Sequence, residues 1–410
     1  MNGTAPKMQP LLQSILLGLV LLFGAPPATF AKPQTLADSI YSGGDIVTMN
    51  DLKPVAEAIA VNNGKILAVG EASEVLRYQG PGTQMVDLHG RTLLPGFIDA
   101  HGHVFNTGLQ ALAANLLARP DGVVNDISAL QQSLQDWADT HPARISSTGW
   151  IIGFGYDDAQ LSEQRHPTRF DLDEVSSTLP VLVIHQSGHL AAINSKGLEL
   201  AGIDASTKDP AGGVIRRIGD GKEPDGVLEE MAFFQLIFTV MGQLGGEDNQ
   251  AILKAGLDLY ASFGFTTAQE GRATVEAVAT EAIVAKQGAL GMDVVAYPDI
   301  QGAASSIKPP LHSKTYTSHF RIGGAKLSLD GSPQGKTAWL TQPYHVPPHG
   351  QPADYRGYPA IADDDEVFAY IDRAFASGWQ VLAHCNGDAA ADQFIAAIRA
   401  ATLKHGEGDR

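Results

Sequence analysis

The sequence predicts an α/β fold built on a (β/α)8 barrel of the TIM type, preceded by a small β-sandwich-type subdomain. Three observations point to this class. From Leu93 onward, short apolar runs alternate with longer helical segments, as expected of βα units around a parallel sheet. Between Ser39 and Leu93 the chain contains short β-type runs and tight turns. A length of 410 residues exceeds one ordinary domain and suits a large barrel with an appended subdomain.

Residues 1–31 are predicted to be a signal peptide. Lys7 precedes the apolar run 11–23, which at about 13 residues is too short to cross a membrane core. Thr29 and Ala31 then supply the small residues of a cleavage site. An uncleaved anchor is the alternative. No later stretch reaches the roughly 18 apolar residues of a membrane helix, so we expect a periplasmic or secreted protein without a stable membrane span.

Residues 32–92 are expected to form the N-terminal β subdomain. The segments 39–49, 55–69 and 84–94 contain short β-type runs that are separated by Asn-Asn-Gly, Gly-Pro-Gly and His-Gly turns. Strands of this length joined by tight turns favour a small antiparallel sheet.

Residues 93–410 are expected to form the barrel. The predicted strands are 93–100, 181–185, 265–270, 293–298, 322–329 and 380–384. The predicted helices are 127–140, 251–263, 274–287, 364–377 and 389–403. A closed barrel needs eight strands, so the predicted barrel is incomplete. The Pro- and Gly-rich stretch 342–358 is expected to be a loop or lid.

Composition excludes several classes of function. The 45 acidic and 28 basic residues give a net charge of −17, which argues against a nucleic-acid partner. The single cysteine, Cys385, excludes internal disulfides and cysteine-based zinc motifs. A metal would therefore be held by His, Asp, Glu or a modified Lys. Assembly as a homo-oligomer stays open.

A pair of histidines follows the first predicted barrel strand. His101 and His103 are two residues apart, so in extended backbone both imidazoles project from the same face. Imidazole nitrogens suit Zn²⁺, and the carboxyl ends of barrel strands are where such enzymes build their sites. Two structural histidines are the alternative. Asp99 could either orient one imidazole or cap the turn.

Two further apolar runs carry ionisable side chains. The run 381–384 ends on His384, which is followed by turn and cap residues. The run 324–331 places Lys326 inside a predicted strand, where desolvation of an ammonium is costly. A neutral or modified amine at a metal centre would explain this position. The alternative is a lysine that extends to solvent or pairs with Asp330 or Glu270.

Several motifs together resemble the amidohydrolase superfamily. The segment 93–103 resembles its first-strand signature, and 58–70 resembles the sheet that precedes its barrel. Segments 188–195, 226–230, 330–332 with Thr337 and Ala338, and 384–388 are similar to the amidohydrolase 3 branch. That branch includes deformylase-like and aminoacylase-like hydrolases of exocyclic C–N bonds. The resemblance extends from Ala37 to the end of the chain.

The resemblance implies a metal centre. His101 and His103 would bind a buried divalent metal, with zinc expected. Lys326 matches a strand lysine that such enzymes can carry as a carbamate bridging two ions, and His384 would bind a second ion. Lys326 and His384 would thus be catalytic as well as metal-binding. A metal-activated water would attack the substrate carbonyl.

The resemblance also implies a substrate pocket for a small molecule. Tyr156, His189, Glu230 and Glu270 fall in family-like segments and would line it. For each of these four, a packing or capping role is the alternative. His185 is a further candidate that could equally belong to the core. No Cys–His–acid arrangement can be recognised around Cys385, which argues against a role of this thiol as a nucleophile.

The resemblance finally predicts that the chain is truncated at its C-terminus. Family members continue with strands that carry a further His and an Asp that shuttles protons. The last residues, 405–410, are polar, and no motif supplies these groups. The favoured function is a metal-dependent hydrolase of amide-type C–N bonds. The alternatives are a catalytically impaired or binding remnant and a deaminase-like enzyme, which product analysis would separate from the first by ammonia release.

Overall fold

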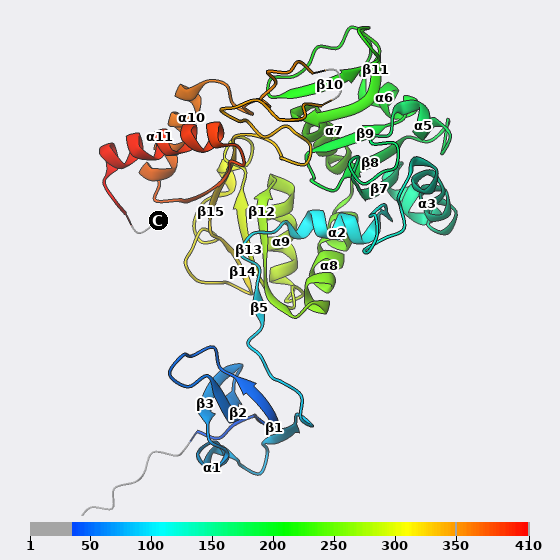
Figure 1. Cartoon of the computed structure of the whole chain (residues 1–410). Coiled ribbons are helices and arrows are strands. Elements are labelled where there is room, and N and C mark those ends of the chain that lie inside the picture. The colour runs from blue at the N-terminus through cyan, green and yellow to red at the C-terminus, as the bar shows by residue number, and fades with distance from the viewer. Residues whose placement is uncertain (1–34, 349–350, 409–410) are drawn as a thin grey trace, which may run out of the picture. The chain divides into compact units, whose positions relative to one another are not determined.

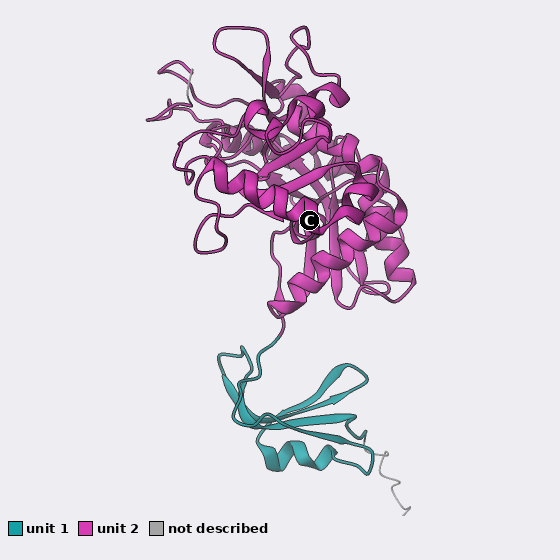
Figure 2. Ribbon diagram, turned by 90° about the vertical axis from the view of Figure 1, so that its right-hand side faces the viewer, with its two compact units in different colours: residues 1–95 teal, residues 96–410 magenta. Residues whose placement is uncertain are grey.

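The computed structural model describes residues 35–348 and 351–408, so the predicted signal peptide at 1–31 lies outside the described residues. The chain divides into two compact units, residues 1–95 and 96–410, coloured separately in Figure 2. The junction between Pro95 and Gly96 lies close to the predicted one at Leu93.

The first unit is built on one four-stranded sheet. Its strands are β1 (Ser39–Val47), β2 (Val55–Asn62), β3 (Lys65–Gly70) and β4 (Gln84–Asp87), in the order β3-β2-β1-β4. β1, β2 and β3 pair antiparallel as predicted, but β4 lies parallel to β1. A parallel neighbour needs a crossover, and here it contains α1 (Ala72–Val75) and η1 (Leu76–Tyr78). The described residues of this unit thus form a single mixed sheet rather than a sandwich.

The second unit contains a run of parallel strands that carries the predicted barrel motifs (Figure 1). Four strands, β5 (Phe97–Ile98), β12 (Phe265–Ala273), β13 (Asp293–Pro298) and β14 (Phe320–Ile322), form a sheet in the order β14-β13-β12-β5. β15 (Gly324–Ser328) pairs with β16 (Gln380–His384). Every pairing in these two sheets is parallel. The α/β class is confirmed, but the described strands do not close into a barrel, because β5 and β16 each have one neighbour.

The predicted strand 322–329 is divided into β14 and β15. Gly323 separates them, and a Cβ at this position would lie only 2.6 Å from the Tyr297 ring. β14 stays beside β13, whereas β15 turns to pair with β16. A bridge between Asp299 and Lys326 still connects the end of β13 to β15.

A second sheet of six strands was not predicted as a separate sheet, and its strand at 181–185 (β8), which was predicted as a barrel strand, lies here and not beside the other predicted strands. It contains β6 (Ala114–Asn115), β7 (Ile151–Tyr156), β8 (Val181–His185), β9 (Leu190–Ile193), β10 (Gly213–Arg217) and β11 (Pro224–Glu230), in the order β10-β11-β9-β8-β7-β6. β6, β7 and β8 are parallel, and the rest pair antiparallel. Alternate residues of β8 face different apolar clusters, Leu182 and Ile184 on one side and Val181 and Val183 on the other, so this sheet is buried on both faces.

The predicted helices are all present with small differences at their ends. They are α3 (Ile127–Thr140), α8 (Gly246–Ser262), α9 (Val275–Lys286), α10 (Asp364–Ala376) and α11 (Asp388–His405). Side chains of Asp126, Thr274 and Asp363 cap three of them. Further helices are α2 (Val104–Leu112), α4 (Pro142–Thr148), α5 (Arg169–Asp173), α6 (Ser195–Ala201), α7 (Met231–Gly242) and the short η2 (Ala304–Ser306).

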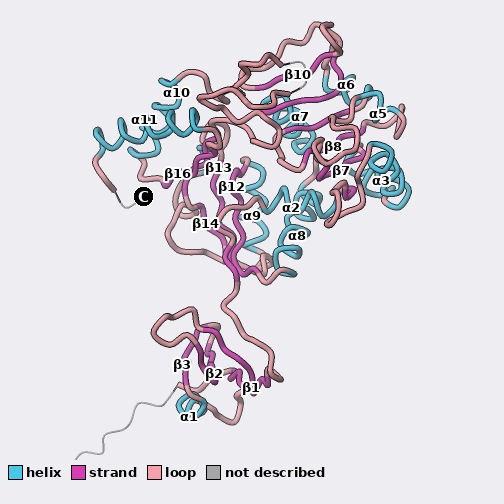
Figure 3. Tube along the Cα trace, in the orientation of Figure 1, coloured by secondary structure: helices cyan, strands magenta, loops and turns pink. Residues whose placement is uncertain are grey.

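The expected loop at 342–358 contains no helix or strand in its described residues and belongs to the long pink connection between β15 and α10 in Figure 3. Of the helices described, none is both long and apolar enough to cross a bilayer. The main apolar cluster of the parallel strands includes Ala268, Val294 and Leu327, one from each of β12, β13 and β15. The carboxyl ends of these strands carry the polar residues described next.

Candidate active site

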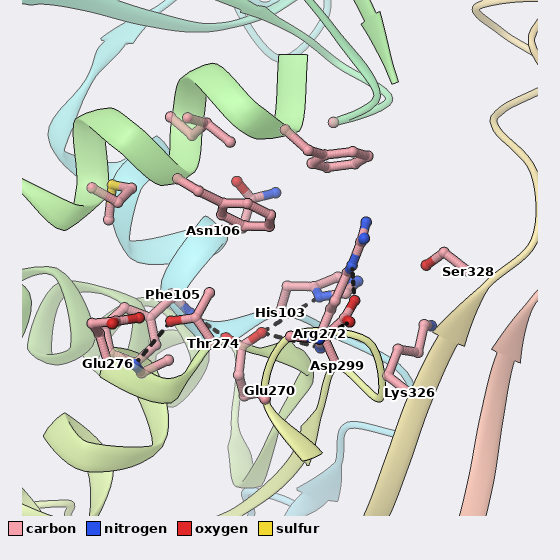
Figure 4. Close-up of a pocket in the computed structure, with 18 of the residues that line it drawn as sticks. His103, Phe105, Asn106, Glu270, Arg272, Thr274, Glu276, Asp299, Lys326 and Ser328 are labelled. Carbon is pink, nitrogen blue, oxygen red and sulfur yellow. Dashed lines mark hydrogen bonds and ion pairs between the residues drawn. The ribbon is translucent and has the colours of Figure 1, made fainter. Parts of the chain in front are cut away.

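A cavity of about 680 Å³ lies within the second unit, at the carboxyl ends of β12, β15 and β16. Five of the predicted site residues line it: His103, His189, Glu270, Lys326 and His384. Figure 4 shows His103, Glu270 and Lys326 directed toward the same open space. The remaining walls come from α2, α7 and the start of α9. The structure thus brings together residues that are far apart in the sequence.

Lys326 contacts His101 inside this arrangement. The Lys326 Nζ atom lies 3.0 Å from Nε2 of His101, and only 2% of the lysine is exposed. Burial lowers the pKa of Lys326 to about 8, and the nearby Arg272 guanidinium adds to the shift. Burial and then Lys326 also lower the pKa of His101. Both groups therefore favour their neutral, lone-pair-bearing forms more than usual. His101 itself does not line the cavity.

His103 faces Glu270 because β5 and β12 are parallel neighbours. Residues Ile98 and Thr267 are paired, and the chain continues into a bridge between His103 and Glu270. Nδ1 of His103 lies 3.5 Å from Oε1 of Glu270, whose side chain is almost fully buried. The other oxygen, Oε2, accepts the backbone N–H of Phe105 at 2.9 Å. This carboxylate therefore lies beside the imidazole of His103, and its position is set by the backbone of Phe105.

Asp99 caps the turn, which is one of the two roles predicted for it; the other was to orient an imidazole. One carboxylate oxygen accepts the backbone N–H of His101 at 3.2 Å. The other accepts the Tyr260 hydroxyl at 2.8 Å and the backbone N–H of Gln269 at 3.2 Å. Asp99 thus fixes the turn that presents the two histidines and ties it to β12.

His384 projects into the cavity from the end of β16. Its Nε2 lies 2.9 Å from the Gly331 carbonyl oxygen and 3.2 Å from the side-chain nitrogen of Asn386. Burial, followed by the neighbouring His189, lowers the pKa of His384 to about 3. The buried Asp330 behind it, 3.8 Å from Nε2, accepts backbone N–H groups of Asn386 and Gly387.

His189 and Glu230 form a hydrogen-bonded pair beside His384. Nδ1 of His189 lies 2.8 Å from Oε2 of Glu230, and the rings of His189 and His384 are 4.6 Å apart. The Thr337 hydroxyl donates to Oε1 of Glu230 at 2.6 Å. The imidazole therefore presents Nε2 as its free nitrogen.

Tyr156 lies away from the cavity, on β7. Its side chain is fully buried, and its hydroxyl is 3.1 Å from Nδ1 of His166. The next two residues, Asp157 and Asp158, face His185, because Tyr156 and His185 are paired in register on β7 and β8. Nε2 of His185 lies 3.7 Å from Asp157 and 3.3 Å from Asp158.

These two aspartates and His185 could hold a metal ion. Their ligand atoms lie within 4.8 Å of one another, and no other three His, Cys, Asp or Glu residues do so in the part of the chain that is described. Burial disfavours the charged imidazole, but the two carboxylates outweigh it and raise the pKa of His185. Hydrogen bonding to His185 in turn holds the pKa of Asp157 well below its ordinary value.

Sequence reasoning missed Asp157, Asp158, Arg272 and Asp299. Asp157 and Asp158 could have been found, because they directly follow the apolar strand β7, which ends beside the strand of His185. Arg272 lies near the end of β12, and Asp299 directly follows β13. The Arg272 Nε donates to Asp299 at 2.8 Å. The sequence alone does not give the register between the parallel strands β12 and β13, and this register is what places Arg272 beside Asp299. Burial raises the pKa of the Cys385 thiol, which is the wrong direction for a nucleophile.

Comparison with known proteins gives consistent matches. A family model described as the amidohydrolase family matches residues 84–410. Protein LONG AFTER FAR-RED 3 of Arabidopsis thaliana is 26% identical over 92% of this chain, which spans 63% of that protein. The N-substituted formamide deformylase of Arthrobacter pascens is 34% identical over 48% of this chain and 35% of its own length.

Structural similarity extends over most of the described fold. A solved structure of an uncharacterized metal-dependent hydrolase from Pyrococcus horikoshii OT3 has a TM-score of 0.63 and 22% identity. The match covers 88% of this chain and 68% of that one. The family model covers well over half of the chain, including every strand that lines the cavity. The chain therefore belongs to the amidohydrolase family.

Proposed function

We propose that the protein is a metal-dependent hydrolase that cleaves amide-type carbon–nitrogen bonds of small molecules. The observation that carries this proposal is the approach of the Lys326 Nζ to Nε2 of His101, at 3.0 Å. A buried lysine whose polar partner is an imidazole, next to a second histidine that faces a buried carboxylate, is an unusual grouping for a purely structural role. The name of the partly matching relative, a formamide deformylase, supports the choice of bond.

The side chains present fit a divalent metal. His101, His103, Lys326 and His384 would hold one or two ions, with zinc expected from the imidazole donors. His384 supports this fit, because its ring lines the cavity and burial lowers its pKa to about 3, so the neutral imidazole keeps one lone pair for a ligand bond. When bound, the metal would activate water and polarise the substrate carbonyl. The name of the structural neighbour, a metal-dependent hydrolase, agrees with this proposal.

The residues around these ligands would orient the chemistry. Glu270 lies beside the ring of His103, and Phe105 and Arg272 donate backbone N–H groups to Glu270. Glu230 fixes the ring of His189, so that Nε2 could accept a hydrogen bond from a substrate N–H group. Tyr156 is proposed to support β7 from behind, since its hydroxyl binds His166.

We further infer that the parallel strands β5 and β12 to β16 are part of a (β/α)8 barrel. Their parallel pairing and the polar groups at their carboxyl ends support this assignment. Export to the periplasm or outside the cell is also proposed, from the predicted signal peptide. The mass of the protein from its native host should then lack roughly the first 31 residues.

The test is hydrolysis of N-formyl and N-acetyl amines by the metal-loaded protein, with amine, carboxylate and ammonia all measured. We expect equal amounts of amine and carboxylate, abolished in H103N and retained in the exposed control H345N. Ammonia release from a ring substrate would instead indicate a deaminase. Metal-loaded protein that releases none of these products would contradict the proposal and favour a binding remnant.

A further inference from the structure

The turn between β8 and β9 carries a serine that lines the cavity. The backbone N–H of Gly188 donates to the carbonyl oxygen of His185 at 2.9 Å and closes this turn. Ser187 is the third residue of the turn, is half-buried and lines the cavity. A short turn between two buried strands is a rigid support, and reactive side chains are often found on such connections.

The hydroxyl of Ser187 contacts an imidazole. Its Oγ lies 2.9 Å from Nδ1 of His185. The backbone N–H of Ser187 donates to the same nitrogen at 3.1 Å, so the lone pair is assigned to Nδ1. The backbone N–H of His189 donates to Oγ at 3.2 Å, which leaves the hydroxyl proton to point toward Nδ1. The imidazole is therefore in position to take up this proton.

The other ring nitrogen of His185 faces two carboxylates. Nε2 lies 3.3 Å from Asp158 and 3.7 Å from Asp157, and the side chain is fully buried. The Gln160 amide donates to Asp157 at 2.8 Å and helps to hold it. Burial disfavours a protonated ring, but the two carboxylates outweigh it and raise the pKa of His185. A serine, a histidine and a carboxylate in this order match the catalytic groups of serine hydrolases, with the two ring nitrogens interchanged.

A hydrogen-bond donor lies beside the turn. Asn106 projects from α2, on one wall of the cavity (Figure 4). A Cβ on Gly188 would lie 3.7 Å from Nδ2 of Asn106, so the amide is close to the turn of Ser187. The Asn106 amide has no hydrogen-bond partner in the part of the chain that is described. It is free to stabilise the oxygen on which negative charge collects when a carbonyl is attacked.

We propose that Ser187 is a nucleophile and gives the protein a second, metal-independent activity, the hydrolysis of small carboxylic esters. In the first step, Oγ of Ser187 bonds to the carbonyl carbon and its proton passes to Nδ1 of His185. The bond from that carbon to the leaving oxygen breaks, and the imidazole returns the proton to the leaving alcohol. Water then attacks the acyl-serine in the same way, which releases the carboxylic acid and restores the hydroxyl. The reaction consumes only ester and water.

The experiment treats the whole chain with diisopropyl fluorophosphate in the presence of EDTA. The serine oxygen displaces fluoride from phosphorus, so peptide mass spectrometry should find a single phosphoryl group per chain, on Ser187. S187A removes only a hydroxyl from a half-buried turn, so it should keep the circular dichroism of the wild type and stay unlabelled. The exposed control S262A should be labelled as fast as the wild type.

Two further variants test the partners of the serine. H185N should slow labelling by about 100-fold or more, because the general base is lost. N106A should slow it by about 100-fold, because the oxyanion loses a donor. Asn106 is exposed, so N106A keeps the test decisive if H185N fails to fold. Both should also lose the initial burst of p-nitrophenol that EDTA-treated wild type is expected to release from p-nitrophenyl acetate.

The pH profile of labelling tests the carboxylates. D158N should move the acidic limb of the profile to lower pH, because one of the two carboxylates that favour the protonated ring is lost. A wild-type protein that stays unlabelled, is labelled at another residue or needs metal for labelling would overturn the inference. Wild-type rates in H185N and N106A would overturn it as well. Amide hydrolysis by the metal-loaded protein does not involve Ser187, so either reaction can fail without the other.

Discussion

The carboxylate of Glu230 binds Nδ1 of His189 at 2.8 Å from a backbone conformation that residues other than glycine rarely adopt, with φ +46° and ψ −118°. Glu230 is the last residue of β11, and α7 begins directly after it. Strain of this kind costs about 1–3 kcal/mol and persists where the surroundings enforce it. Here the enforcing contacts include the hydroxyl of Thr337, at 2.6 Å.

The first prediction concerns this pair. E230Q should lower kcat/KM for amide hydrolysis by about 10- to 100-fold, because the imidazole of His189 loses its charged orienting partner. The exposed control E199Q should have no effect. H189N combined with E230Q should be no worse than H189N alone, since the two residues act as a unit. Additive losses in the double variant would show that Glu230 acts independently of His189.

The second prediction concerns Lys326. K326M should fold, because it places an apolar chain of similar length in a buried position, but it should lose at least one equivalent of metal. Mass spectrometry of protein equilibrated with zinc measures the stoichiometry. K254M, at an exposed position on α8, is the matched control and should bind as wild type does. An unchanged metal content in K326M would exclude the lysine as a ligand.

The third prediction separates the two groups that could hold metal. The backbone N–H of Ser187 donates to Nδ1 of His185 at 3.1 Å, so Nε2 carries a proton toward Asp157 and Asp158. We therefore expect Nε2 of His185 to face the two carboxylates as a donor rather than to serve as a metal ligand. D158N should leave the metal content unchanged and reduce the free energy of unfolding by about 1–3 kcal/mol. Loss of one equivalent of metal in D158N, with H103N unaffected, would reverse this assignment.

The fourth prediction concerns a buried carboxylate on α9. Glu281 is fully buried, neither oxygen has a hydrogen-bond partner among the described groups, and burial raises its pKa well above the ordinary value, with Glu270 adding to the shift. Above about pH 4.5 the unfolded chain releases this proton while the native chain keeps it. Stability therefore falls as pH rises through that range, by up to about 1.4 kcal/mol per pH unit.

E281Q removes this titration. Chemical denaturation should show equal stability of wild type and E281Q at pH 4 and a more stable E281Q at pH 8. The exposed control E223Q should follow the wild type at both values. Parallel curves for wild type and E281Q would mean that Glu281 is ionised in the native state.

The sequence predicted the individual strands and helices near the site better than the way in which the strands pair into sheets. Strands such as Val181–His185 and Gln380–His384 were predicted to the residue, because an apolar run ends on a polar residue at each. The strand-end positions of His103, Lys326 and His384 followed from the apolar runs before them, whereas family resemblance supplied Glu270 and the metal-binding roles. Family resemblance supplied His189 and Glu230, whose hydrogen bond no spacing rule predicts.

Long-range packing accounts for what was not predicted. Strands β9, β10 and β11 pair antiparallel within a sheet that begins parallel, and a βα periodicity does not encode that change. β9 follows β8 through a turn in which Gly188 adopts φ +71°, a local signal that a search for βα units passes over. The position of α7 against the cavity, and with it the environment of Arg272, depends on this sheet.

The central claim is that a divalent metal is bound between the end of β5 and β15. Diffraction from crystals soaked in zinc, recorded at the zinc absorption edge, locates the ion directly. The account predicts an anomalous peak in contact with His101, His103 and Lys326. A map whose only peak lies at Asp157, Asp158 and His185, or one without any peak in the second unit, would contradict it.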